Sequence, residues 1–184
     1  EVTLADGTKK IVGVTTLDFS NFDVFVGDGP YFVDSDRDGD IDRADTPSED
    51  AFGLLLEDST VAVALFKPKD KSDRSRYHAV SARVGSVDIV GFDSSFISIT
   101  ASGLSLEVNG GHDGVNADAR PALDFSQLPD GKFTVATGNG GVDFTFTKRL
   151  LQVGIEDLAL DLDGFFQVSG AFTYTRVEGL SVKL

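Results

Sequence analysis

The sequence predicts an all-β fold: an elongated antiparallel module of the β-sandwich type, with one inserted calcium loop. Two observations predict it. Apolar residues alternate with polar ones along most of the chain, which is the period of half-buried strands, and helical periodicity is nearly missing. Turn dipeptides bound these segments at short intervals, which favours hairpins between antiparallel strands. A β-solenoid fits the same alternation and is the alternative fold.

The alternation is clearest in the second half of the chain. In the stretch FFQVSGAFTYT, Phe166, Val168, Phe172 and Tyr174 share one face, with Gly170 between them. Four further segments have the same period: Ile97 and Ile99; Leu104, Leu106 and Val108; Val142, Phe144 and Phe146; Leu158, Leu160 and Leu162. Each segment predicts a strand with one apolar face.

Glycine-containing dipeptides mark the expected turns because glycine readily adopts positive φ. They are Asp6-Gly7, Asp28-Gly29, Asp130-Gly131, Asn139-Gly140 and Asp163-Gly164. Three longer loops are predicted at 27–50, 67–76 and 109–121. None has the character of a domain linker, so we expect residues 1–184 to form a single β-rich module with a calcium loop at 34–45.

The chain is strongly acidic, with a formal net charge of −14 over 184 residues. Such a surface repels nucleic acid and anionic lipid, so cations are the better partners. Cysteine is absent, which excludes disulfides and thiolate metal sites. No apolar run has the length of a membrane span, so we expect no membrane insertion. The chain begins Glu1-Val2-Thr3 without a signal peptide, and we expect it to be a segment of a longer protein.

The stretch DSDRDGDIDRAD, residues 34–45, has the spacing of a twelve-residue calcium loop. Asp34, Asp36 and Asp38 stand at positions one, three and five, and Gly39 stands at six, where the chain must turn sharply. The remaining ligand positions hold Asp40 (through its carbonyl), Asp42 and Asp45, while Ile41 is predicted to anchor the loop to the core. Carboxylates this close repel one another unless a cation lies between them.

Calcium is the ion that this loop predicts. It takes six to eight oxygen ligands in flexible geometry, whereas Mg²⁺ demands a stricter octahedron, and the loop offers no nitrogen or sulfur ligand for zinc or copper. The loop ends in Asp45 rather than in the glutamate of an EF-hand. After it, Thr46-Pro47-Ser48-Glu49 is a capping box that predicts one or two turns of helix, ending at Gly53.

Two levels of resemblance follow from these residues. The loop pattern with aspartate at its last position resembles the loops of dockerins and of thrombospondin type 3 repeats. The wider stretches FVGDGPYFVDSDRDGDIDRADTP, PALDFSQLPDGKFTVATG and LALDLDGFFQVSGAFTYT resemble a long repeat of very large bacterial surface and secreted proteins of the calcium-dependent adhesin type. This resemblance implies an extracellular, calcium-stabilised and non-catalytic repeat module.

Other polar clusters give weaker signals. The loop 109–121 holds Asp113, Asn116 and Asp118, which form either a second calcium site or an ordinary polar loop. The basic stretch 67–76 is either solvated or a docking site for an acidic neighbour. The two histidines, His78 and His112, belong to no recognisable catalytic motif, so we expect no enzyme.

Together these observations predict a spacer or stalk module on the bacterial cell surface, with bound Ca²⁺ as a folding ligand. Its expected partners are neighbouring repeat modules of the same chain. The alternative function is a calcium-dependent ligand-binding or carbohydrate-binding module, which would contact a surface ligand beside the calcium loop.

Overall fold

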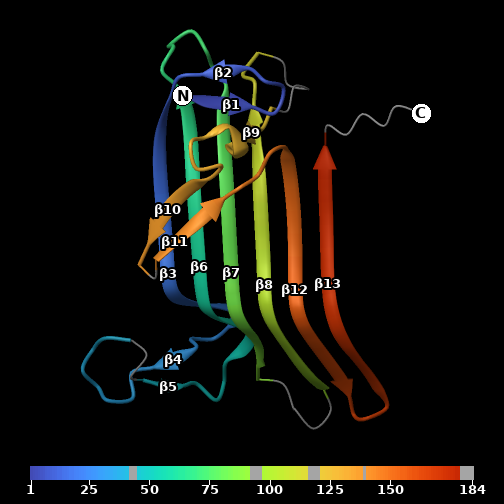
Figure 1. Cartoon of the computed structure of the whole chain (residues 1–184). Helices are drawn as coiled ribbons and strands as arrows, with labels where there is room; N and C mark the ends of the chain where they lie inside the picture. The colour runs from blue at the N-terminus through green and yellow to red at the C-terminus, as the bar shows by residue number, and fades with distance from the viewer. Residues whose placement is uncertain (42–44, 92–96, 116–120, 139, 179–184) are drawn as a thin grey trace.

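A six-stranded antiparallel sheet dominates the computed structural model, which describes residues 1–41, 45–91, 97–115, 121–138 and 140–178. The sheet order is β13-β12-β8-β7-β6-β3, so the strands follow one another across it in chain order (Figure 1). The strands are β3 (Val12–Asp28), β6 (Phe52–Pro68), β7 (Arg76–Val90), β8 (Ile97–His112), β12 (Arg149–Leu162) and β13 (Phe166–Glu178). The chain is therefore all-β, as the alternation predicts.

Three small sheets accompany the large one. Two of them, with the 3₁₀ turn η1 (Phe125–Gln127), lie over one face near the chain's N-terminal end, and the third lies at the opposite end (Figure 1). The first two are β2-β1-β9 and β10-β11, and the third is β4-β5. Their bounds are β1 (Val2–Leu4), β2 (Lys9–Lys10), β4 (Phe32–Val33), β5 (Thr46–Pro47), β9 (Leu123–Asp124), β10 (Phe133–Thr137) and β11 (Gly140–Phe144).

The core lies between the covered face of the large sheet and two of the small sheets, β2-β1-β9 and β10-β11, with η1. On that face the strands present small side chains, Ala62, Ala64 and Ala79, which let the second layer approach closely. Phe125 of η1 fills the space above them, with its ring centroid 5.9 Å from that of Phe66 and within 6.3 Å of three more phenylalanine rings. The second layer thus makes the molecule sandwich-like, but over only part of one face.

The opposite face of the large sheet is covered by no described element, and we call it the open face. Strand pairing places whole apolar rows on it. One row, from β3 to β13, is Phe19, Val61, Ala82, Leu106, Val153 and Tyr174. Eleven of its large apolar side chains are 38–60 % exposed: Leu17, Phe19, Val26, Phe52, Leu54, Leu65, Leu151, Phe166, Val168, Phe172 and Tyr174.

Irregular residues lie at the same level in neighbouring strands of the large sheet. They keep the apolar side chains on the open face along the whole length of the strands. Asn21, Asp58 and Gly103 have positive φ values of 61°, 52° and 63° on three strands. On β3 and β6 the residues of the open face are odd-numbered on one side of this level and even-numbered on the other. An extra residue in each strand requires this change, because side chains otherwise alternate between the two faces. The partners of β12 and β13 shift by one between Ile155 and Leu158, because β13 has no extra residue at this level.

The structure corrects several expectations. Every described ladder is antiparallel, which excludes the β-solenoid for the described chain because solenoid coils stack parallel strands. The loops are also shorter than predicted: residues 27–28 belong to β3, 67–68 to β6 and 109–112 to β8.

The helical turn predicted after the calcium loop is wrong. Thr46 and Pro47 form β5, and the Ser48 amide donates to the Tyr31 carbonyl at 2.6 Å. A residue before proline favours the extended conformation, and pairing with β4 reinforces this preference at Thr46. The segment with the capping-box pattern therefore forms a strand paired with β4 and not a helix.

Candidate metal centre

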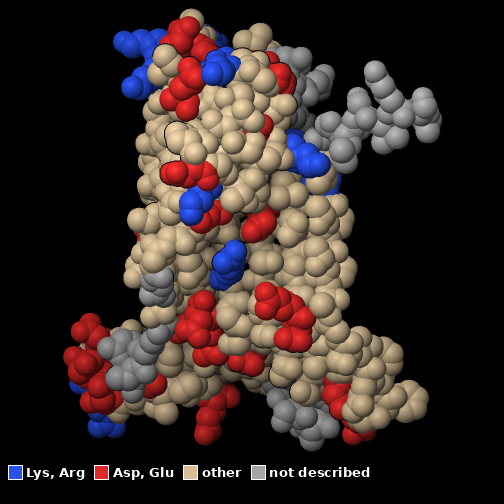
Figure 2. All heavy atoms as spheres, in the orientation of Figure 1, with Lys and Arg blue, Asp and Glu red and all other residues tan. Residues whose placement is uncertain are grey.

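The predicted calcium loop spans the gap between β4 and β5. Val33 pairs with Thr46 and Phe32 with Pro47, so the residues that flank the loop are held side by side. The Phe25 and Tyr31 rings stack with centroids 5.3 Å apart, which attaches this hairpin to the large sheet. Figure 2 shows acidic side chains gathered over the β4–β5 end of the molecule. The loop is thus a closed excursion from a two-stranded ladder.

Three aspartates of the loop lie together. One carboxylate oxygen from each of Asp34, Asp36 and Asp38 lies within 4.8 Å of the others, and all three residues are exposed. Two oxygens bound to one Ca²⁺ at about 2.3–2.6 Å are at most roughly 5 Å apart. The spacing therefore fits three ligands of a single ion.

Hydrogen bonds to the loop backbone hold these carboxylates in place. The Asp38 amide donates to Asp36 Oδ1 at 3.1 Å, and the Asp40 amide donates to Asp38 Oδ1 at 2.8 Å. The Gly39 amide donates to Asp34 Oδ2 at 3.2 Å, which folds the loop back on its first residue. Gly39 has a φ of 90°, as the sharp turn at this position requires. Each bond uses one carboxylate oxygen, and the second oxygen of each group can face an ion.

Asp45 closes the loop from its other end. Its Oδ1 accepts from the Ser35 amide at 2.8 Å and from Ser35 Oγ at 3.2 Å, and its residue is only 7 % exposed. The last predicted ligand is therefore held beside the first, although it does not belong to the three-residue cluster.

The remaining predicted positions differ in outcome. Asp40 is exposed and lies outside the described cluster, and Asp42 lies outside the described residues. Ile41 is 64 % exposed, so the prediction that it anchors the loop to the core is wrong. The β4–β5 pairing and the stacked Phe25 and Tyr31 rings attach the loop to the rest of the fold. Of the second predicted site, Asp113 is described, while Asn116 and Asp118 lie outside the described residues.

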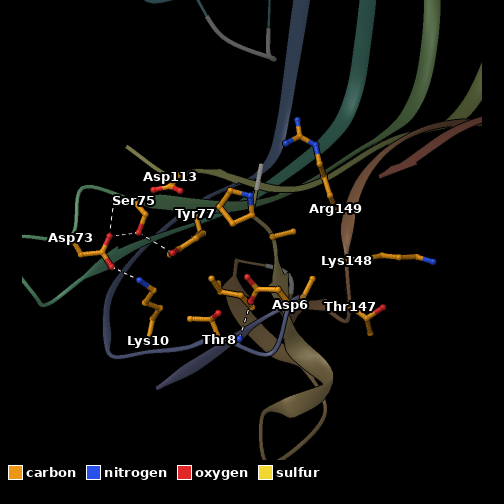
Figure 3. Close-up of a pocket in the computed structure, with 14 residues that line it drawn as sticks. Asp6, Thr8, Lys10, Asp73, Ser75, Tyr77, Asp113, Thr147, Lys148 and Arg149 are labelled. Carbon is orange, nitrogen blue, oxygen red and sulfur yellow. Dashed lines mark hydrogen bonds and ion pairs between the residues drawn. The ribbon is translucent and has the colours of Figure 1, made fainter. Parts of the chain in front are cut away.

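A cavity of about 800 Å³ with a mixed polar and apolar lining lies at the other end of the molecule, beside β1 and β2 (Figure 3). On one side of it, Lys10 Nζ contacts Asp73 Oδ2 at 2.6 Å, and Asp73 also accepts from Ser75, whose Oγ lies 2.8 Å from the Tyr77 hydroxyl. The hydrogen bond from Lys10 and those from Ser75 lower the pKa of Asp73 to about 2.

Sequence reasoning missed this network. It treated 67–76 as a basic loop, but Asp70 and Asp73 within it each accept a backbone hydrogen bond from the serine two residues later. The repeated Asp-x-Ser spacing was the signal that could have revealed two ordered turns.

Neither histidine forms a described catalytic arrangement. His78 lies on β7 facing the open side of the sheet, where burial and the nearby Arg149 lower its pKa. His112 ends β8 and pairs with Arg76 of β7. The structure therefore adds no geometry in favour of catalysis by these two residues.

Comparisons with known proteins give no relative for this chain: no family model, no curated protein and no solved structure matches it. Among the described residues, no helix has the length and apolar character needed to cross a membrane.

Proposed function

We propose that this chain is a calcium-stabilised architectural module of a large bacterial extracellular or surface protein. The observation that carries the proposal is the convergence of Asp34, Asp36 and Asp38 in a loop whose two ends are paired through β4 and β5. Such a loop joins two strands of the fold, so an ion that holds the loop also holds those strands.

Calcium suits the loop chemically and thermodynamically. The three clustered side chains offer only carboxylate oxygens, the ligands that hard cations prefer. An ion between them would replace mutual repulsion by ligation, and it would bind the folded chain in preference to the unfolded one. Calcium outside cells reaches the range in which even a weak site of ~10⁻⁴–10⁻³ M fills.

The topology suits an architectural role. The chain enters the large sheet at the β3 edge and leaves it at the β13 edge, after visiting each strand in turn. Successive modules of one chain could therefore lie edge beside edge without a crossing connection. In this role neighbouring modules are the partners, and no catalytic group is required.

A ligand-binding module is the second candidate, because of the cavity beside Lys10 and Asp73. It lies at the end of the molecule away from the calcium loop (Figure 1). A ligand in this cavity would therefore bind without touching the calcium ion, unlike the calcium-bridged ligand that the sequence suggested. Protection of the Tyr77 region by added ligand, unchanged by a calcium chelator, would favour this candidate.

The test of the first proposal is a calorimetric calcium titration of the 184-residue chain. We expect one ion per chain, with a Kd of about 10⁻⁴–10⁻³ M or tighter. Asp38→Ala should weaken binding by at least ~10-fold, because it removes one ligand and one negative charge.

Asp130→Ala is the matched control. Asp130, like Asp38, is exposed and precedes a glycine with positive φ, but it lies outside the cluster. This variant should bind calcium like the parent chain. Equal loss of affinity in both variants would show that only the overall negative charge attracts the ion, and it would refute the loop as the site.

A further inference from the structure

The open face of the large sheet is apolar across its whole width. Below the row from Phe19 to Tyr174, a second row has members on all six strands: Val26, Leu54 and Ile89 are paired in one half, and Ile99, Leu160 and Val168 in the other. The halves meet one residue beyond the last β7–β8 pair, Asp88 with Thr100. Between these rows, none of the residues that the ladders pair and place on this face is charged; Asp58 and Glu156, at the irregular level, belong to none of these pairs. The small sheets that form the core all pack on the other side, so no described part of the chain shields these residues from water.

The exposed area is too large for an ordinary monomer surface. The five aromatic side chains of the open face are 48–57 % exposed. Since such a side chain has ~150–250 Å² to bury, these five alone expose roughly 500 Å². The largest apolar patch of a typical monomer is about 300–600 Å² in total. The six exposed aliphatic side chains bring the face to the ~800 Å² per partner that a stable interface buries.

We propose that the open face packs against the open face of a second copy of this chain, which completes the β-sandwich between two molecules. Two flat apolar sheet faces of equal width can interdigitate at a separation of about 10 Å. The same patch then serves both copies, as a two-fold interface requires.

The ends of the open face carry opposite charges, and this fixes the direction of packing. Lys67 and Arg76 follow directly on the last β6–β7 pair, Phe66 with Tyr77, at one end of the face, and Arg149 lies near His78 at the same end. Asp28 lies at the opposite end, on the same face as Phe52, and the hairpin at Asp163 closes that end. A two-fold axis perpendicular to the strands brings the basic end of each copy to the acidic end of the other.

Analytical ultracentrifugation across about 1 µM to 1 mM protein tests the interface. We expect a concentration-dependent dimer, both with calcium and with chelator. The variant Leu17→Asp with Phe172→Asp places charges on the open face at both sheet edges and should raise the dimer Kd at least ~10-fold.

Its matched control is Thr16→Asp with Thr173→Asp. These exposed threonines are the next residues on the same two strands but point to the other face, so this variant should dimerise normally. Equal weakening in both variants would overturn the assignment of the face. A chain that stays monomeric throughout this concentration range would also overturn the proposal. This holds equally if the monomeric chain floats with phosphatidylcholine vesicles in a flotation assay.

A charge-reversal cycle tests the direction and does not depend on changing the apolar residues. Lys67→Glu and Asp28→Lys should each weaken the dimer, because each places like charges together in the antiparallel arrangement. The double variant should recover most of the loss. If the double variant is weaker than either single variant, the copies do not pack in antiparallel fashion.

Discussion

Aspartate side chains in this chain repeatedly fix the backbone two residues ahead of them. Asp6, Asp70, Asp73 and Asp124 each accept a hydrogen bond from the amide at that distance, as do Asp36 and Asp38 of the loop. Such a turn is therefore common here and does not by itself identify a metal site. The candidate calcium loop differs because one carboxylate oxygen from each of three aspartates lies within 4.8 Å of the others.

Asn109 links the large sheet to the second layer. It is fully buried, and its Nδ2 donates to the carbonyls of Leu123 and Lys148 at 2.8 and 2.9 Å. Asn109→Ala leaves the buried Leu123 carbonyl and the partly buried Lys148 carbonyl without this donor, at ~1–3 kcal/mol for a buried group. We expect a loss of about 2–4 kcal/mol of unfolding free energy, measured by denaturant titration.

Thr100→Ala is the control for this prediction, because Thr100 is exposed on the same strand, β8. It should change the unfolding free energy by less than about 0.5 kcal/mol. An Asn109→Ala variant as stable as this control would contradict the role assigned to the amide.

Asp73 should make stability depend on pH in the acid range. Its folded pKa of about 2 lies below its ordinary value of 3.8, because Lys10 and Ser75 stabilise the carboxylate. Its contribution to stability is therefore complete above about pH 4 and disappears as the pH falls towards 2. We expect the difference in unfolding free energy between the parent chain and Asp73→Asn to shrink across this window.

Lys10→Met checks the cause of that pH dependence. It removes the ion-pair partner of Asp73, so it should remove much of the pH-dependent part of the unfolding free energy. Adding Asp73→Asn to this variant should then change the unfolding free energy by less than it does in the parent chain. Full additivity of the two substitutions would show that the ion pair is not the origin of the effect.

At the scale of elements, glycines allow β3 and β6 to approach closely near the calcium loop. Gly27 pairs with Gly53, and a Cβ on Gly53 would lie 2.4 Å from the Val26 carbonyl oxygen and 2.6 Å from Gly27 Cα. Gly53→Ala must therefore push two backbones apart. We expect it to cost about 1–3 kcal/mol of unfolding free energy and to disturb the adjacent β4–β5 hairpin.

Gly13→Ala is the control in the same strand pair. A Cβ on Gly13 meets nothing nearer than 4.0 Å, and its φ is not in the left-handed region. This variant should keep or slightly raise stability, as alanine restricts the unfolded chain more than glycine does. Chemical denaturation measures the unfolding free energy of both variants. Equal stability of the two variants would contradict the close approach of β3 and β6 at Gly53.

The strands could be predicted from the sequence because period-two alternation reports the exposure of a sheet directly. Turns were equally visible, and Gly7, Gly29, Gly131 and Gly164 all have the positive φ expected. The row of irregular residues could not be foreseen from any one strand, since it becomes evident only when neighbouring strands are aligned. The helix expected after the loop failed because a local capping signal competed with pairing to β4, a partner on the far side of the loop.

The candidate site was predictable in part. The spacing of Asp34, Asp36 and Asp38 gave three residues that the structure brings together, because turn geometry within five residues is local. The hydrogen bonds of Asp45 to Ser35 depend on the two-stranded base of the loop, and the exposure of Ile41 depends on how the hairpin leaves the sheet. Both are tertiary features that the spacing alone does not contain.

On the scale of the whole molecule, the fold is a large sheet with a core at one end, the β4–β5 hairpin and its candidate metal loop at the other, and one face that no described element covers. The second layer buries only the upper part of the covered face, so the lower part of the long sheet lies outside the main core. This arrangement explains why an ion at the far end could matter for stability. The calcium loop lies where the apolar core does not reach (Figure 1).

Calorimetric melting of the 184-residue chain, in about 10 mM calcium and then in excess chelator, tests the account most directly. With calcium at about 100 times its Kd, binding to the folded state adds ~2.7 kcal/mol. For a chain of this size we expect Tm to rise by roughly 5–10 °C, with a smaller rise in the same concentration of magnesium. The same Tm in calcium and in chelator would contradict the claim that calcium stabilises this fold.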